Sequence, residues 1–383
     1  MNFAWSLGMT YPLRQHMPNA VYECTTRTIQ GRYLLRPSMQ LRRRMIGILS
    51  AAEELYPLVK LHSFAVLSNH WEFLASSVCA EEFSLYSGYV NSNFARECGR
   101  AHEWSGPFWG RRVRMIPCLD DEATIDRLRY CMAQSAKEGL VDSPLDWPGA
   151  TAVPALVGDM TLIGERIDRK AMRRAREAAC RQGIAIDTIH EADYTRETRL
   201  QLTPLPVFQN LEKETLRTRH VELLNSIVAL AASERMGRPS LGVLAITRQD
   251  PHTAPLHFEP TPAPSCHTSS AQLRCAFQRL RNAFTIAYRN VADAIANLLS
   301  PRLQRRYGDH ASSPTTDDSA HVKTPSSVAK ATMTTSLVDL QQQVPPGMFL
   351  QPRFMRPPPR QLLAELATAR FPDRLTVGWS NAA

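Results

Sequence analysis

The sequence predicts an α+β protein built on a ferredoxin-like antiparallel sheet with helices on one face and an appended helix that carries Tyr130. Three observations support this fold class. Four short segments alternate between apolar and polar residues, as half-buried strands do. Longer segments with helical spacing separate them, and their order is strand, helix, strand, strand, helix, strand, helix. A mainly helical C-terminal extension with a disordered segment is expected to follow.

The individual elements follow from local pattern and from turn chemistry. Alternation and β-branched or aromatic residues predict strands at Ala20–Thr28, Lys60–Leu67, His70–Ser76 and Arg111–Pro117. Helical spacing predicts helices at Ser38–Leu55, Glu82–His102 and Asp120–Lys137. Ser68-Asn69 is short enough to close a tight hairpin between the second and third strands. The acidic run that opens the third helix suits a helix N-terminus.

The chain is expected to divide into three parts. Pro144–Gly149 breaks the pattern of the first domain, 1–150. The extension, 151–300, is expected to be mainly helical, with a basic helix at Asp168–Gln182 and a possible strand within 195–209. Further helices are expected at Glu212–Glu234 and Ser270–Leu299. The tail, 301–383, is rich in Ser, Thr, Asp and Ala with little aromatic content, which predicts a largely disordered segment.

Composition favours a protein that binds a polyanion and resides in the cytoplasm. The 383 residues carry a formal net charge of +9, and Arg is well suited to phosphate. No apolar run approaches the ~20 residues that a membrane span needs, so no membrane partner is expected. The first residues lack the layout of a signal peptide. The eight scattered cysteines include no CxxC pair, which predicts reduced thiols.

Two spacings place four reactive side chains in one pocket. Alternate residues of a strand share a face, so His70 and Glu72 point the same way. Residues four apart on a helix also share a face, which groups Tyr130 with Gln134. Imidazole, carboxylate and amide oxygen are suitable ligands for Mg²⁺ or Mn²⁺. The phenol of Tyr130 is a nucleophile that can form a covalent link with phosphorus. Each residue also has an ordinary structural reading, as core or solvated surface.

Basic residues near this pocket are candidates for a phosphate track. They are Arg27 in the first strand, Arg111, Arg112 and Arg114 in the fourth, and Arg127 on the helix of Tyr130. A solvated strand edge is the competing reading for each strand arginine. The aromatic residues Trp104, Phe108 and Trp109 could stack bases, or could equally close the core beneath their loop.

These motifs resemble the single-tyrosine HUH transposases, and most of all the insertion-sequence-200-like, REP-associated branch. The resemblance rests on four segments within 12–150: PNAVYECTTR, VLSNHWEFL, GPFWGRRV and LRYCMAQSAKEGLV followed by DWPG. The Asn69-His70-x-Glu72 segment stands where the family has Asn-His-x-His. The segment from Tyr130 to Gln134 matches the family's Tyr-x-x-x-Asn/Gln helix motif.

The resemblance implies a metal-dependent DNA transposase. Tyr130 would attack single-stranded or hairpin DNA, giving a 5′-phosphotyrosine and a free 3′-OH, and the reverse step would join a new end. His70, Glu72 and Gln134 would hold Mg²⁺ or Mn²⁺. Tyrosine must be activated by a base or a nearby positive charge, for which Arg127 is the candidate. Members of the family act as monomers or homodimers.

The departure from the family lies at Glu72, where the second motif His is expected. A carboxylate still binds Mg²⁺ or Mn²⁺, so the change does not abolish metal binding on chemical grounds. It opens an alternative, a domesticated and cleavage-deficient DNA-binding protein or regulator. A replication-initiating nickase of the same superfamily is a third reading, which the missing helicase segment and the order of the motifs disfavour.

Overall fold

The computed structural model describes residues 14–255 and 263–307, without the side chains of 291–307. By its internal contacts the chain divides into two compact units, Met1–Arg289 and Asn290–Ala383. The first unit contains the sheet and the candidate site. The described residues of the second form the last part of helix α8 (Ala271–Tyr307). Of the tail expected to be disordered, 301–307 belong to α8 and the remainder lies outside the described residues.

A four-stranded sheet of order β2-β3-β1-β4 confirms the predicted fold class. The strands pair antiparallel throughout, in the arrangement of a ferredoxin-like sheet. The elements that build this domain are β1 (Val21–Arg27), α1 (Met39–Leu55), β2 (Val59–Val66), β3 (His70–Ser77), α2 (Ala80–Ala101), β4 (Arg114–Pro117) and α3 (Asp121–Lys137), with a one-turn 3-10 helix, η1 (Ile29–Gly31), after β1. The expected hairpin turn is also present, since Leu67 N–H donates to His70 C=O at 2.8 Å across Ser68 and Asn69.

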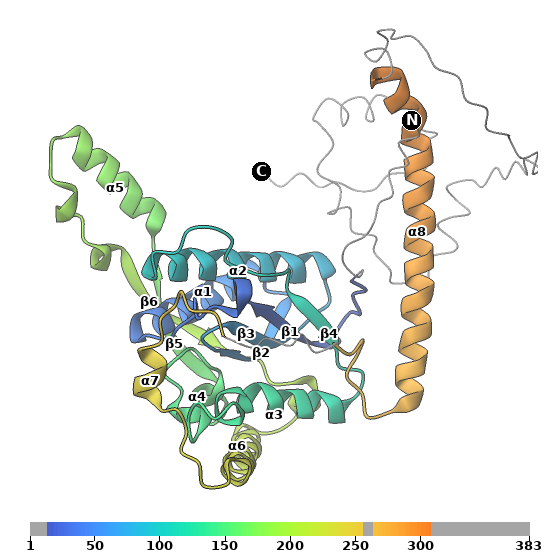
Figure 1. Cartoon of the computed structure of the whole chain (residues 1–383), viewed down its shortest axis with the longest axis horizontal. Helices are drawn as coiled ribbons and strands as arrows, with labels where there is room; N and C mark the ends of the chain where they lie inside the picture. Colours follow the sequence, from blue (N-terminus) through green and yellow to red (C-terminus); the bar gives the residue numbers. More distant parts are fainter. Residues whose placement is uncertain (1–13, 256–262, 308–383) are drawn as a thin grey trace, which may run out of the picture. The chain divides into compact units, whose positions relative to one another are not determined.

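The sheet has two differently covered faces (Figure 1). Trp71 and Phe73 of β3 are fully buried toward α1 and α2, where Trp71 packs 5.1 Å from the ring of Phe94. Because strand side chains alternate, His70 and Glu72 project from the opposite face. That face is covered by α3, whose contacts with the sheet are to β2 and β3. The helices α1 and α2 therefore share one face, as predicted, and the appended helix α3 lies on the other.

The chain beyond α3 continues to pack on the same unit. Its elements are η2 (Pro144–Asp146), α4 (Val153–Leu156), β5 (Thr161–Ile167), α5 (Arg169–Arg181), η3 (Ile186–Thr188), η4 (Glu191–Tyr194), β6 (Thr195–Gln201), η5 (Pro206–Phe208), α6 (Lys213–Arg235) and α7 (Val243–Thr247). The strands β5 and β6 form an antiparallel hairpin against α1, and α6 packs on α3. The domain boundary expected at 150 stays a prediction, but described residues on both sides of it belong to one unit.

The hairpin β5–β6 differs from the helical extension that the sequence favours. A strand within 195–209 was anticipated, but Thr161–Ile167 was not. Its sequence, TLIGERI, has a glycine at its centre and exposes Ile163, so its pattern is weak. The strand forms because it pairs with β6 over its whole length and because α1 lies against it, which local sequence does not reveal.

Later segments also cover both edges of the main sheet. At the edge strand β2, Thr203 N–H donates to Leu61 C=O at 2.9 Å, and Val66 N–H donates to Ala150 C=O at 2.9 Å. At the other edge, His267 N–H donates to Pro117 C=O at 2.8 Å just after β4. Unpaired edge groups would otherwise be exposed to solvent or to other chains. No described helix is both long and apolar enough to cross a membrane, and all eight cysteines are free thiols.

The helix α1 and the strand β5 cross at two glycines. A Cβ atom added to Gly47 would lie 2.0 Å from the carbonyl oxygen of Glu165, and one added to Gly164 would lie 2.4 Å from the Gly47 nitrogen. Both distances are far below van der Waals contact. The hairpin can therefore approach α1 closely only because neither position carries a side chain.

We expect Gly47→Ala to destabilise the protein by roughly 2 kcal/mol, as other overpacked contacts do. The clash with β5 outweighs the gain of about 1 kcal/mol that alanine gives inside a helix. Gly88→Ala is the matched control, because Gly88 lies in α2 with no atom within 4 Å of the added Cβ. Urea unfolding should show a gain in stability for Gly88→Ala. Equal gains for both variants would contradict the close crossing.

Candidate active site

Three of the predicted site residues meet beneath α3. Gln134 Nε2 donates to Glu72 Oε2 at 2.8 Å, which joins α3 to β3. The exposed fractions are 7% for His70, 3% for Glu72 and 2% for Gln134. His70 also lies within hydrogen-bonding reach of Gln134. The two periodicities that predicted the pocket thus bring an imidazole, a carboxyl and an amide together.

The imidazole of His70 is held neutral. Burial is the largest cause that lowers its pKa, to about 3, and the positive charges of Arg27 and Arg114 act in the same direction. A hydrogen bond with Gln134 opposes the shift without offsetting it. His70 Nδ1 lies 2.7 Å from Asn69 Oδ1, an acceptor, so the ring proton belongs on Nδ1. Nε2 is then left with a lone pair, which is the form that binds metals.

A second buried carboxyl, Glu23, was not anticipated. It lies on β1, where Thr25 pairs with Glu72 and Glu23 pairs with Leu74, so the two glutamates share a face diagonally. Burial and the negative charge of Glu23 raise the pKa of Glu72. Two carboxyls this close favour a state in which one is ionised, and the opposite shifts assign that charge to Glu23.

The charge on Glu23 is balanced by two partners. Burial alone would raise the pKa of Glu23, but contact with His267, together with the charges of His267, Arg127 and Arg114, lowers it. His267 Nε2 is in ion-pair contact with Glu23 Oε2, and Arg127 Nη1 lies 4.0 Å from the same oxygen. One partner comes from α3, the helix of Tyr130, and the other from a residue far along the chain.

His267 reaches the site because its segment continues the edge of β4. Leu119 N–H donates to His267 C=O at 2.9 Å, which seats the segment beside the start of α3. Asp120 caps α3 through Ala123 N–H at 2.7 Å and also accepts from Ser269 N–H at 3.1 Å. The sequence offered one signal for Glu23, a glutamate within an alternating apolar strand. No local pattern indicated His267.

Tyr130 lies one helical turn from Gln134, at the edge of this cluster. Its ring is half-buried between two cations, with Arg127 Cζ 4.6 Å and Lys137 Nζ 4.4 Å from its centroid. Arg127, expected to activate the hydroxyl, therefore lies over the ring. Lys137 was missed, although its position seven residues after Tyr130 places it on the same helix face.

The side chain of Tyr130 lines a cleft between α3 and α6. The cavity has a volume of about 210 Å³. The residues that line it are Asp126, Arg129, Tyr130, Ala133, Lys137, Ile227, Leu230, Ala231 and Glu234. One wall therefore comes from the first domain and the other from the extension. The cleft places the ring of Tyr130 among two basic residues, two acidic residues and a short apolar wall from α6.

The predicted DNA-contacting arginines lie in different settings. Arg27 ends β1 and Arg114 begins β4, and both are exposed on the side of His70 and Glu72. Burial, followed by the charge of Arg114, lowers the pKa of Arg27. The strand expected at Arg111–Pro117 begins only at Arg114, so Arg111 and Arg112 lie in the preceding loop. Their loop is held by pairing of Trp109 with Thr28, which replaces strand pairing there.

The donor set suits a hard divalent cation if the amide of Gln134 contributes. Among the described residues, no three His, Cys, Asp or Glu side chains are arranged to hold a metal. A site would therefore need His70, Glu72 and Gln134 together. Glu72 Oε1 is buried without a hydrogen-bond partner, as a ligand atom would be. Neutral imidazole, carboxylate and amide oxygen are acceptable donors to Mg²⁺ or Mn²⁺.

Two transposases are among the solved structures that are similar to this chain. Neither a protein-family model nor a curated protein matches this chain. A REP-associated tyrosine transposase bound to a REP hairpin is 16% identical, with 39% of this chain and 86% of that chain covered at a TM-score of 0.33. A proposed transposase from Deinococcus radiodurans R1 is 13% identical, with 31% and 94% covered at a TM-score of 0.21. At these scores the function must be argued from the site itself.

The bond between Gln134 and Glu72 can be tested by a double-mutant cycle. We expect Gln134→Ala and Glu72→Ala to show a favourable coupling of about 1–2 kcal/mol in urea unfolding, because each alone leaves a buried polar partner unsatisfied. The experiment is run with a metal chelator present. Gln201→Ala paired with Glu72→Ala is the control, since Gln201 lies on β6. Purely additive effects for Gln134 and Glu72 would contradict the contact.

Proposed function

We propose that this protein is a metal-dependent DNA strand-transferase that cuts and rejoins single-stranded or hairpin DNA through Tyr130, as a transposase does. The observation that carries the proposal is the arrangement on α3. Tyr130 and Gln134 are one turn apart, and Gln134 is bonded to Glu72 beside the neutral imidazole of His70. A nucleophile next to a set of metal-binding donors is the combination that phosphoryl transfer requires.

The chemistry divides between the donor cluster and the tyrosine. His70, Glu72 and Gln134 would hold Mg²⁺ or Mn²⁺, which when bound supplies positive charge to the scissile phosphate. The Tyr130 oxygen attacks phosphorus and loses its proton, and the bond from phosphorus to the 3′ oxygen breaks. The released 3′ oxygen takes up a proton, leaving a 5′-phosphotyrosine. Attack by another 3′-OH reverses these steps and joins a new end.

The cations around Tyr130 suit a phosphate substrate. Arg127 and Lys137 flank the ring, while Arg27 and Arg114 are exposed beside the donor cluster. Phosphate oxygens accept hydrogen bonds from such side chains, which position the backbone without reading its sequence. A phosphodiester drawn to these cations would lie close to both the nucleophile and the donors. A cytoplasmic location and a monomeric or homodimeric state remain expectations from the sequence.

Tyr130→Phe tests the assignment directly. We expect wild-type protein with Mn²⁺ to nick a single-stranded oligonucleotide carrying a hairpin and to remain covalently attached to it. Tyr130→Phe should reduce attachment at least about 1,000-fold, because the attacking oxygen is removed, while binding changes less than about threefold. Denaturing gels and mass spectrometry measure the adduct. Tyr89→Phe is the matched control, on α2 across the sheet.

Attachment that persists in Tyr130→Phe would show that another residue is the nucleophile. A second outcome is that wild type and Tyr89→Phe bind the hairpin but form no covalent attachment with either Mg²⁺ or Mn²⁺. The protein would then bind DNA without cleaving it. These outcomes separate the DNA partner from the reaction.

A cleavage-deficient DNA-binding protein is the second candidate function, and the contacts of Glu72 favour it. Glu72 already bonds to Gln134 and is influenced by Glu23, so its carboxyl is engaged within the protein. A carboxyl held in its protonated form is a poor metal ligand. In this case the cluster would stabilise the fold, and the exposed arginines would bind DNA.

Glu72→His distinguishes the two functions. If the protein is cleavage-deficient, the variant should bind Mn²⁺ at least about tenfold more tightly and gain covalent attachment, because a neutral imidazole replaces the protonated carboxyl. If the wild type is an active enzyme, the wild type and Glu72→His should both bind Mn²⁺, and Glu72→His should show no gain in covalent attachment. Electron paramagnetic resonance of Mn²⁺ follows binding independently of nicking. Glu53→His, on α1 away from the cluster, is the control.

A further inference from the structure

The residues between β5 and β6 form an arm that is separate from the Tyr130 cleft. The arm contains α5, η3 and η4, and α5 stands beyond the end of the β5–β6 hairpin (Figure 1). The helix packs chiefly on η3 and η4, which form the return limb of the same arm. Most of its surface is consequently open to solvent.

The exposed surface of α5 is strongly basic. The helix carries six cationic side chains and a single acidic one, Glu177. Its buried residues are Met172 and Ala179. Lys170, Arg174 and Arg181 are exposed on the opposite side, because positions four and eleven residues apart lie close to one line along a helix. These three residues are called the basic stripe.

No described residue forms an ion pair that neutralises the basic stripe. Arg173 pairs with Glu177 at 3.5 Å along the helix. None of the stripe residues forms an ion pair with the described part of the chain, although the return limb carries the acidic residues Asp187, Glu191 and Asp193. The positive charge of the stripe is therefore available to a partner outside the chain.

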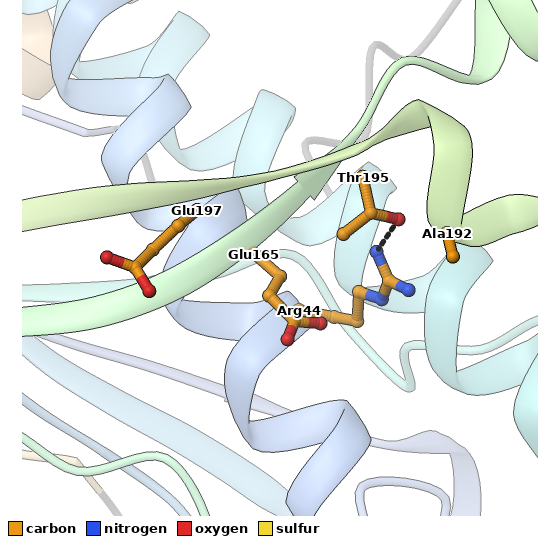
Figure 2. Close-up of a pocket in the computed structure, with 5 residues that line it drawn as sticks. All are labelled: Arg44, Glu165, Ala192, Thr195 and Glu197. Atoms are coloured by element: carbon orange, nitrogen blue, oxygen red, sulfur yellow. Dashed lines mark hydrogen bonds between the residues drawn. The ribbon is translucent and has the colours of Figure 1, made fainter.

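The base of the arm is fixed by a network of ion pairs. Arg169 Nε donates to Glu97 Oε1 at 2.8 Å on α2, and Arg169 Nη1 donates to Glu191 Oε2 at 3.0 Å. Arg44 Nη2 of α1 donates to the other Glu191 oxygen at 2.7 Å. Figure 2 shows Arg44 beside Thr195, to which its Nη1 donates at 3.4 Å, and both residues line an open cavity of about 380 Å³. These contacts hold the arm in a defined position on α1 and α2.

We infer that the basic stripe of α5 binds the phosphate backbone of double-stranded DNA, as a second DNA contact distinct from the Tyr130 cleft. Duplex DNA presents about one negative charge per 1.7 Å of its axis, and this dense negative charge attracts an exposed line of cations. Proteins that hold single strands commonly stack bases on aromatic rings, and α5 has no aromatic residue. The inference rests on the proposed function only in taking DNA as the partner.

The arm variant Lys170→Gln/Arg174→Gln/Arg181→Gln tests the stripe, since glutamine preserves helix propensity. Fluorescence anisotropy follows full-length protein on a blunt 25-base-pair duplex without a hairpin, from 50 to 200 mM KCl. We expect the variant to bind the duplex at least about tenfold more weakly at 50 mM. The slope of log K against log salt should fall by about 2 to 3, as three lost phosphate contacts require.

A charge-matched control removes three cations elsewhere. Lys60→Gln/Arg96→Gln/Arg219→Gln lowers the net charge equally, at exposed positions on β2, α2 and α6. This control should change the slope by less than about 1. Equal losses in the two variants would overturn the assignment, since net charge alone would then explain binding.

Two further probes identify the partner. An equal loss on a 25-nucleotide single strand, or a loss confined to anionic phospholipid vesicles with duplex binding intact, would also overturn the proposal. Circular dichroism confirms that α5 remains folded in the arm variant. These experiments measure binding and not nicking, so they remain valid if Tyr130 proves not to cleave DNA. A negative result for the basic stripe likewise does not affect the test of Tyr130.

Discussion

Burial of polar side chains between the sheet and α3 is the constraint on which the candidate site depends. The outer face of α3 meets α6, while its inner face covers His70 and Glu72. Buried polar groups are costly unless they are paired. The amide of Gln134 satisfies one carboxyl oxygen of Glu72, so the contact between helix and sheet includes a specific polar bond. The helix that carries Tyr130 is thereby fixed in register with the strand that carries the donors.

The second glutamate turns this pair into an electrostatic network. Glu23 and Glu72 cannot both be charged at low cost, and the ionised partner is Glu23, which contacts Arg127 and His267. Arg127 also lies over the ring of Tyr130. The guanidinium group of Arg127 therefore lies near both the acid pair and the ring of the candidate nucleophile. A change in the charge of the acid pair acts on Tyr130 through this one group.

The sequence predicted the first domain because its signals are local. Alternation in β1 and β3 sets which side chains share a face, and helical spacing in α3 groups Tyr130 with Gln134. Contacts between distant segments escaped prediction for the opposite reason. His267 reaches Glu23 only through pairing beside β4, and β5 is held by its close crossing with α1. The proximity of Glu23 to Glu72 required the strand register, which the sequence alone does not provide.

The extension also determines what can reach Tyr130. Leu224, Ile227 and Ala231 are buried residues of α6, and Ile227 and Ala231 also line the cleft opposite Tyr130. Removing α6 would expose apolar surface on α3 and delete one wall of the cleft. A substrate segment at Tyr130 must therefore fit between a helix of the first domain and a helix of the extension. Residues beyond 150 therefore shape the cleft at Tyr130, even though every predicted reactive side chain precedes that position.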